Sequence, residues 1–104
     1  MIKIITMKKT VNLVSAYHFD VFCGMNDYAD IKCGGPPTLG YDFYVDGENT
    51  KNQKKFKKII EDLLKKYNRH YQSISVRIIK EFREDQLWSE EDIERCIKNH
   101  NPND

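Results

Sequence analysis

The chain has 104 residues, of which 39% are hydrophobic and 32% are charged, and its formal net charge is +1. This length predicts a single domain over residues 1–104, able to bury about 65% of its unfolded surface. Aromatic residues make up 12% of the chain, which excludes the composition of a disordered protein. The sequence has no apolar run of membrane-spanning length and no signal-peptide pattern, so we expect no membrane segment and a cytoplasmic location.

Period-two alternation of apolar residues predicts strands in the first half of the chain. Residues 11–23 alternate over the longest stretch, residues 28–33 and 41–47 repeat the pattern, and residues 2–5 are a candidate for a further short strand. Residues 34–40, with sequence GGPPTLG, are expected to form a connection because proline has no N–H to donate to a ladder. On the first long strand the apolar residues expected to share one face are Val11, Leu13, Tyr17, Phe19, Val21 and Cys23.

Helical periodicity begins after residue 49. Thr50 and Gln53 have the spacing of a capping box, and apolar residues then recur at helical intervals up to Tyr67. Residues 74–82 return to period two, and a last helix is expected to open at Ser89, followed by three acidic residues. The residues expected to face inward on the strand are Ile74, Val76, Ile78 and Phe82, and those on the last helix are Ile93, Cys96, Ile97 and His100.

These elements predict an α+β fold in the order β-β-β-α-β-α. We expect a mostly antiparallel sheet of four or five strands with both helices on one face, because the apolar stripe of each helix must be buried against the sheet.

Three cysteines form an odd set, whereas small secreted domains usually carry an even disulfide framework. We therefore expect a reducing compartment. Cys23 and Cys33 are separated by nine residues, unlike the close pairs of structural zinc sites. A zinc site completed by Cys96 and His100 is the alternative, but buried free cysteine is common in proteins. The prediction is free thiols, with no metal and no cofactor.

Two strands carry polar residues at the alternate positions that are expected to face outward. These are His18 and Asp20 on the first strand, and Asp42, Tyr44 and Asp46 on the other. Such a cluster could hold a cation or act as acid and base, but outward positions of a half-solvated sheet are polar by default. The sequence has no phosphate-binding glycine loop, HExxH or GxSxG motif. We therefore expect that the protein is not an enzyme.

Charge is distributed unevenly along the chain. Residues 1–49 carry four Lys and six acids, residues 50–83 carry eleven Lys or Arg and three acids, and residues 84–104 carry two bases and seven acids, giving −2, +8 and −5. The basic block could bind an acidic partner, although i,i+4 pairs such as Lys58 with Asp62 are also typical of a solvated helix face.

Two functions of different classes follow. The first is a small intracellular binding or inhibitor protein that occupies the surface of a protein partner, such as a nucleic-acid-handling enzyme. Bacterial immunity proteins and phage-encoded anti-defence inhibitors are of this kind. The alternative is a nucleic-acid-binding domain that uses the basic helix over residues 50–68 and the following strand. The sequence pI of about 7.7 argues against the alternative. The candidate partner-binding residues are Lys51, Lys54, Lys58, Lys65, Arg69, Tyr71, Leu39 and Tyr44.

Overall fold

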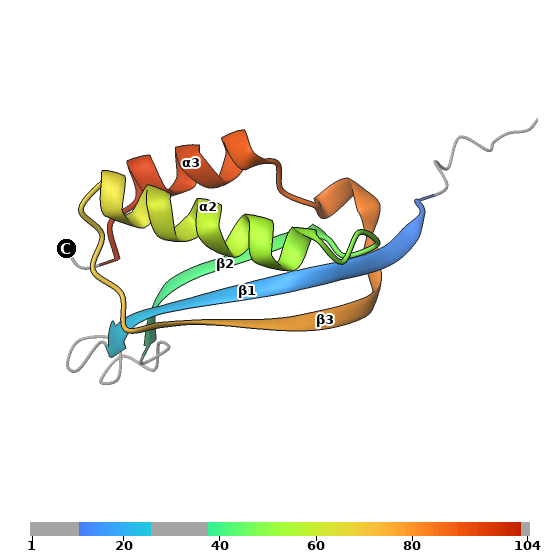
Figure 1. Ribbon diagram of the computed structural model, residues 1–104, viewed down its shortest axis with the longest axis horizontal. Helices are drawn as coiled ribbons and strands as arrows, with labels where there is room; N and C mark the ends of the chain where they lie inside the picture. Colours follow the sequence, from blue (N-terminus) through green and yellow to red (C-terminus); the bar gives the residue numbers. More distant parts are fainter. Residues whose placement is uncertain (1–10, 26–37, 103–104) are drawn as a thin grey trace, which may run out of the picture.

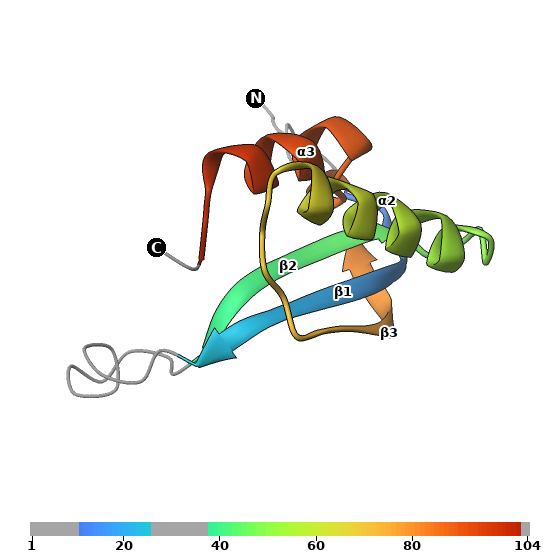
Figure 2. The ribbon, with the colours of Figure 1, turned by 60° about the vertical axis from the view of Figure 1, so that its left-hand side comes forward.

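The computed structural model describes residues 11–25 and 38–102. In this part of the chain three antiparallel strands form one sheet in the order β2-β1-β3, and both α-helices lie on the same side of it (Figures 1 and 2). Neither of these helices combines the length and the apolar content needed to cross a bilayer. The elements are β1 (Leu13–Met25), β2 (Thr38–Asp46), α2 (Asn52–Lys66), β3 (Ser73–Arg83), a 3-10 turn η1 (Glu84–Gln86) and α3 (Glu90–Asn99).

The predicted α+β class, the antiparallel pairing and the two helices are confirmed. The strand number was only partly right, because the described residues form three strands in the order β-β-α-β-α. The additional strands were predicted within residues 2–5 and 28–33, which lie outside the described residues.

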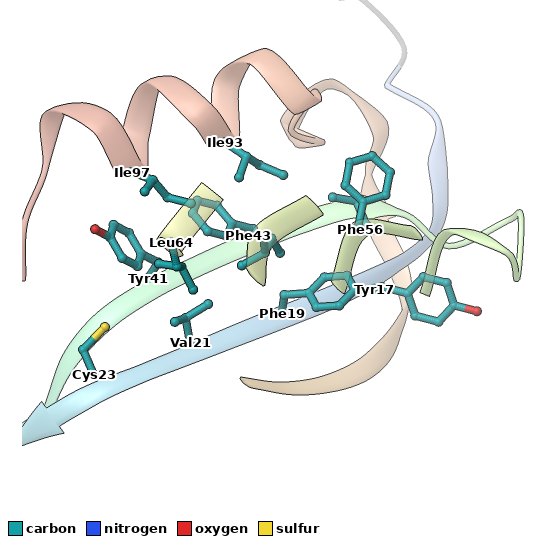
Figure 3. Packing of buried hydrophobic residues seen from close by; sticks show 12 residues of the cluster. Tyr17, Phe19, Val21, Cys23, Tyr41, Phe43, Phe56, Leu64, Ile93 and Ile97 are labelled. Atoms are coloured by element: carbon teal, nitrogen blue, oxygen red, sulfur yellow. The ribbon is translucent and has the colours of Figure 1, made fainter. Parts of the chain in front are cut away.

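The hydrophobic core lies between the sheet and the two helices (Figure 3). Phe19 of β1 and Phe43 of β2 face each other across the strand pair and are fully buried. Leu64 of α2 and Ile97 of α3 cover them from above. The alternation in β1 therefore produces one buried face from Tyr17 to Cys23, as its period predicted.

Helix α2 presents the predicted apolar stripe to the core, with Phe56, Ile60 and Leu64 buried one turn apart. Its beginning differs from the prediction. The helix starts at Asn52 and has no side-chain cap, so the capping box of Thr50 and Gln53 does not form.

Helix α3 begins where the sequence predicted. Ser89 accepts a hydrogen bond from the Asp92 amide, and the Asp92 carboxylate accepts one from the Ser89 amide, which completes a capping box. Trp88, immediately before the cap, packs its ring edge against Phe43 with centroids 5.1 Å apart.

A bulge in β3 changes which side chains face inward. Val14 pairs with Phe82, whereas Ala16 pairs with Ile79, so two residues of β3 stand opposite Ser15. Phe82 was predicted to face the core, but the extra residue turns it to the opposite side of the sheet. Ile78 lies on the helix side of the sheet as predicted, yet it is 47% exposed.

β2 begins three residues earlier than predicted. Thr38, Leu39 and Gly40 belong to the strand rather than to the connection, and Leu39 packs against the core instead of standing exposed in a turn. Gly40 lies so close to β1 that a Cβ atom would come within 1.9 Å of the Val21 carbonyl oxygen. A larger residue at position 40 would therefore push the two strands apart.

Candidate functional site

The sheet has one face under the helices and a second face that no described element covers (Figures 1 and 2). The strand register assigns the residues of this second surface, which we call the open face. Its members from β1 and β2 are Val14, Ala16, His18, Asp20, Phe22, Gly40, Asp42, Tyr44 and Asp46, and those from β3 are Ser73, Ser75, Arg77, Ile79 and Phe82.

Three parallel rings from three strands lie at the centre of the open face. Tyr44 stacks on His18 with ring centroids 4.5 Å apart and an interplanar angle of 7°. Its other side stacks on Phe82 at 4.8 Å and 11°. Ala16 pairs with Asp46 and lies between His18 and Val14 on this face, and it is fully buried. The small alanine side chain leaves room for the rings above β1.

His18 is held by hydrogen bonds on both sides. Its Nε2 lies 2.8 Å from Asp42 Oδ1, and its Nδ1 accepts a hydrogen bond from Arg77 Nε at 3.2 Å. Because Nδ1 is an acceptor here, the hydrogen-bond network assigns the ring hydrogen to Nε2, which donates to Asp42. The Asp42–His18–Arg77 chain thus links all three strands, and it explains how a histidine only 7% exposed has its polar atoms satisfied.

A hollow of about 250 Å³ lies beside this network, lined by His18, Asp20, Ser75, Val76 and Arg77. A histidine acting as a general base needs an unprotonated nitrogen directed at the substrate. In this arrangement the unprotonated nitrogen faces Arg77 and the other is bound to Asp42. The network therefore holds the His18 ring and the Arg77 side chain in place.

The predicted lysines lie on the other side of the molecule. All four are exposed: Lys51 immediately precedes α2, and Lys54, Lys58 and Lys65 lie on the helix away from the stripe that packs on the sheet. Lys58 forms an exposed ion pair with Asp62 at 3.5 Å. Helix α3 binds residues at the end of α2 and just after it, and Glu94 forms an ion pair with Lys66 at 3.1 Å. The acidic helix thus leaves the four candidate lysines uncovered.

Arg69 holds helix α3 in place. Its guanidinium donates to the Ile97 carbonyl at 3.0 Å, to the Lys98 carbonyl at 2.9 Å and to the Tyr67 carbonyl at 2.8 Å. These bonds satisfy carbonyls at the C-terminal end of α3, which have no partner within the helix. Tyr71 lies on the loop that follows and is 38% exposed.

The structure separates the predicted site residues into different places. Tyr44 is at the centre of the open face, Leu39 packs against the core, and the lysines are on the far side of the helices. Phe82 and Arg77 were not expected to join Tyr44. Ile79 and Phe82 are three residues apart rather than two, and this spacing was the available signal for the bulge.

Cys23, Cys96 and His100 gather around Tyr41. The edge of the His100 ring lies against the Tyr41 ring with centroids 5.9 Å apart, and both thiols influence the Tyr41 hydroxyl electrostatically. Burial raises the pKa of both thiols. Across the described ranges no three potential ligands come close enough to hold a metal, and Cys33 lies outside those ranges.

Comparison of this chain with protein-family models, with curated proteins and with solved structures finds no match.

Proposed function

We propose that this chain is a small binding protein that acts by occupying the surface of a protein partner, with the open face as its docking surface. The observation that carries the proposal is the stack of His18, Tyr44 and Phe82 at the centre of a sheet face left uncovered by every described element. A solvated sheet face is ordinarily polar, so a row of aromatic rings there has a cost in water that a partner would remove.

The central side chains are of the types that dominate protein interfaces. Tyrosine and arginine are enriched among residues whose truncation weakens binding most. Tyr44 is fixed between two rings, and Arg77 is fixed by His18, so little side-chain freedom remains to be lost when a partner binds.

The charge around the rings supports a partner with basic residues at its rim. Asp20, Asp42 and Asp46 lie on the open face, and Arg77 is its one basic residue. Complementary charge speeds association and selects among partners more than it adds affinity. Since the lysines of α2 lie beyond the helices, they would not oppose such a partner directly.

A nucleic-acid-binding domain remains the second candidate, supported by the six exposed lysines of α2 and by Lys51 just before it. Three other basic residues of the same block do not extend their surface. Arg69 is bonded to carbonyls of α3, Arg77 faces the opposite side of the sheet, and Arg83 is paired with Asp85 at 3.0 Å. Lys80 is exposed on β3, so among the described residues of this block the positive surface consists mainly of the lysines of one helix.

The test begins with affinity capture from the source cells, which identifies the partner, followed by calorimetry with that purified partner. Tyr44→Ser should weaken binding by about 30-fold or more, the effect of losing a dominant contact. Tyr71→Ser is the matched control, because it removes an exposed tyrosine away from the open face. Circular dichroism would verify that both variants fold.

The control should bind within about threefold of the wild type, as expected for a residue outside the contact surface. If Tyr44→Ser binds normally and Lys54→Glu with Lys58→Glu abolishes binding, the docking surface is α2 and the open face is excluded.

A further inference from the structure

The outer edge of β2 carries main-chain groups that no described residue pairs. Gly47 donates to the Ser15 carbonyl of β1, so odd-numbered positions around β2 bond inward. The carbonyls of Tyr44 and Asp46 bond instead to the Trp88 amide at 2.7 Å and to the Asn52 side chain at 3.0 Å, both on the outer side. By the same alternation the N–H and C=O of Asp42 point outward.

The segment before α3 makes one backbone hydrogen bond to this edge but does not form a strand. The Trp88 amide makes one ladder-like bond to Tyr44, after which Ser89 starts α3 and the chain rises away from the sheet. In the described residues nothing takes up the pairing at the next outward position, Asp42. Between Tyr41 and Tyr44 this edge strand has no proline, lysine or bulge, which are three of the features that prevent strand addition, and its charged residue is Asp42.

A hollow of about 480 Å³ lies above this edge, between α3 and the segment that precedes it. Leu87, Trp88 and Cys96 give it an apolar part. Two of its lining residues contact β2, since Trp88 contacts Phe43 and His100 contacts Tyr41, and both partners are side chains on the helix side of the strand. A strand added at Asp42 would direct every second side chain to the helix side of the sheet, where this hollow lies.

We infer that the outer edge of β2 at Asp42, together with the hollow beside α3, binds an extended peptide segment of a protein partner by strand addition. Main-chain bonds to Asp42 give the affinity, and alternate side chains give the selectivity. The peptide carries apolar residues on the side that meets Leu87, Trp88 and Cys96, and basic residues on the side next to the Asp42 carboxylate. This inference does not depend on the open face being a docking surface.

The probe is a synthetic peptide of about nine residues that alternates valine and lysine, a typical strand length. The control peptide has the same composition in a Val-Val-Lys-Lys order, which cannot place all valines on one side of a strand. Fluorescence anisotropy should give binding at least tenfold tighter for the alternating peptide. Equal binding of the two peptides, or binding of neither, would overturn the inference.

Two substitutions at one position isolate the main-chain bond. Asp42→Ala removes the carboxylate and keeps the amide, whereas Asp42→Pro removes both; proline is accepted on an edge strand whose N–H faces outward. The alternating peptide should bind Asp42→Pro at least tenfold more weakly than Asp42→Ala. Equal affinities of the two variants would mean that the Asp42 N–H makes no bond to the peptide, which would overturn the inference.

Amide exchange of the wild type gives an independent readout if the proline variant does not fold. The Asp42 amide should exchange rapidly in the free monomer, while the inward-bonded Phe43 amide exchanges slowly, and the peptide should protect Asp42. Slow exchange of the Asp42 amide in the free monomer would show that the chain covers its own edge. Protection of this amide that rises with protein concentration would show that a second copy of the chain pairs with the edge. Either result excludes the inference. Tyr44→Ser should leave peptide binding unchanged. Failure of the peptide to bind can therefore be distinguished from failure of the open face as a docking surface.

Discussion

His18 illustrates how one residue can belong to a surface and still be buried. On the open face its ring is covered by Tyr44 on one side, and its two nitrogens are engaged by Asp42 and Arg77. Removing either hydrogen-bond partner would leave a polar atom of a buried ring unsatisfied, which costs free energy. The histidine therefore acts as a support that sets the positions of Tyr44 and Arg77.

Tyr41 carries the clearest prediction for a single residue. Burial raises the pKa of its hydroxyl to about 12, although Arg69 acts in the opposite direction. The hydroxyl also donates to the His100 carbonyl, so the folded protein keeps it protonated. A tyrosine in an unfolded chain has a pKa of about 10. The stability that this group contributes is thus complete below about pH 10 and is lost as the pH rises toward 12.

In the Tyr41→Phe variant, the free energy of unfolding should depend less steeply on pH between about 10 and 12. Denaturant titrations at several pH values measure this slope, and tyrosinate absorbance of the native protein should lose its highest step. Tyr71→Phe is the control and should keep that step. An unchanged slope in Tyr41→Phe would contradict the burial of this hydroxyl.

Helix α2 has one side packed against the core and the other side exposed to solvent. Leu64 is fully buried between the sheet and α3, whereas the Lys58 side chain is 77% exposed. Helix propensity differs little between leucine and lysine, so the contrast in their contribution to stability comes from burial.

Leu64→Ala should lower the free energy of unfolding by about 2–5 kcal/mol, because it removes buried methyl groups and leaves a cavity. Lys58→Ala should change it by no more than about 0.5 kcal/mol. Urea titrations followed by circular dichroism measure both. Similar losses from the two variants would mean that α2 is rotated about its axis relative to the arrangement described.

At the scale of the whole molecule, two surfaces of different charge lie on opposite sides. The open face carries three aspartates and one arginine, and α2 with the residue before it carries the four candidate lysines, all exposed. A protein partner at the open face would leave the lysines free to influence its approach at long range, an effect that salt screens.

The limited extent of the basic surface predicts weak nucleic-acid binding. Each phosphate contact on duplex DNA makes log affinity fall with log salt by about 0.9, so a few lysines cannot sustain affinity at high salt. We expect no sub-micromolar binding of DNA or RNA at about 150 mM salt, while capture of the protein partner persists. Tight binding under these conditions that is lost in the Lys54→Glu, Lys58→Glu double variant would favour the nucleic-acid function.

The sequence by itself determined the features that depend on neighbouring residues along the chain. Alternation in β1 predicted its buried face, the apolar stripe predicted α2, and Ser89 followed by three acidic residues predicted the start of α3. Each of these follows from a local period or a local hydrogen bond, so no distant contact was needed to predict it.

Only the tertiary structure decided which residues meet on the open face. His18, Tyr44 and Phe82 come from three strands, and they meet because of the pairing register and the bulge opposite Ser15. Leu39 moved from a predicted turn into the core for a related reason, since β2 continues pairing with β1 past Gly40. A shift of one residue in the strand register moves every side chain beyond it to the opposite face of the sheet. That register is set by contacts between segments far apart in the sequence, which a local pattern does not contain.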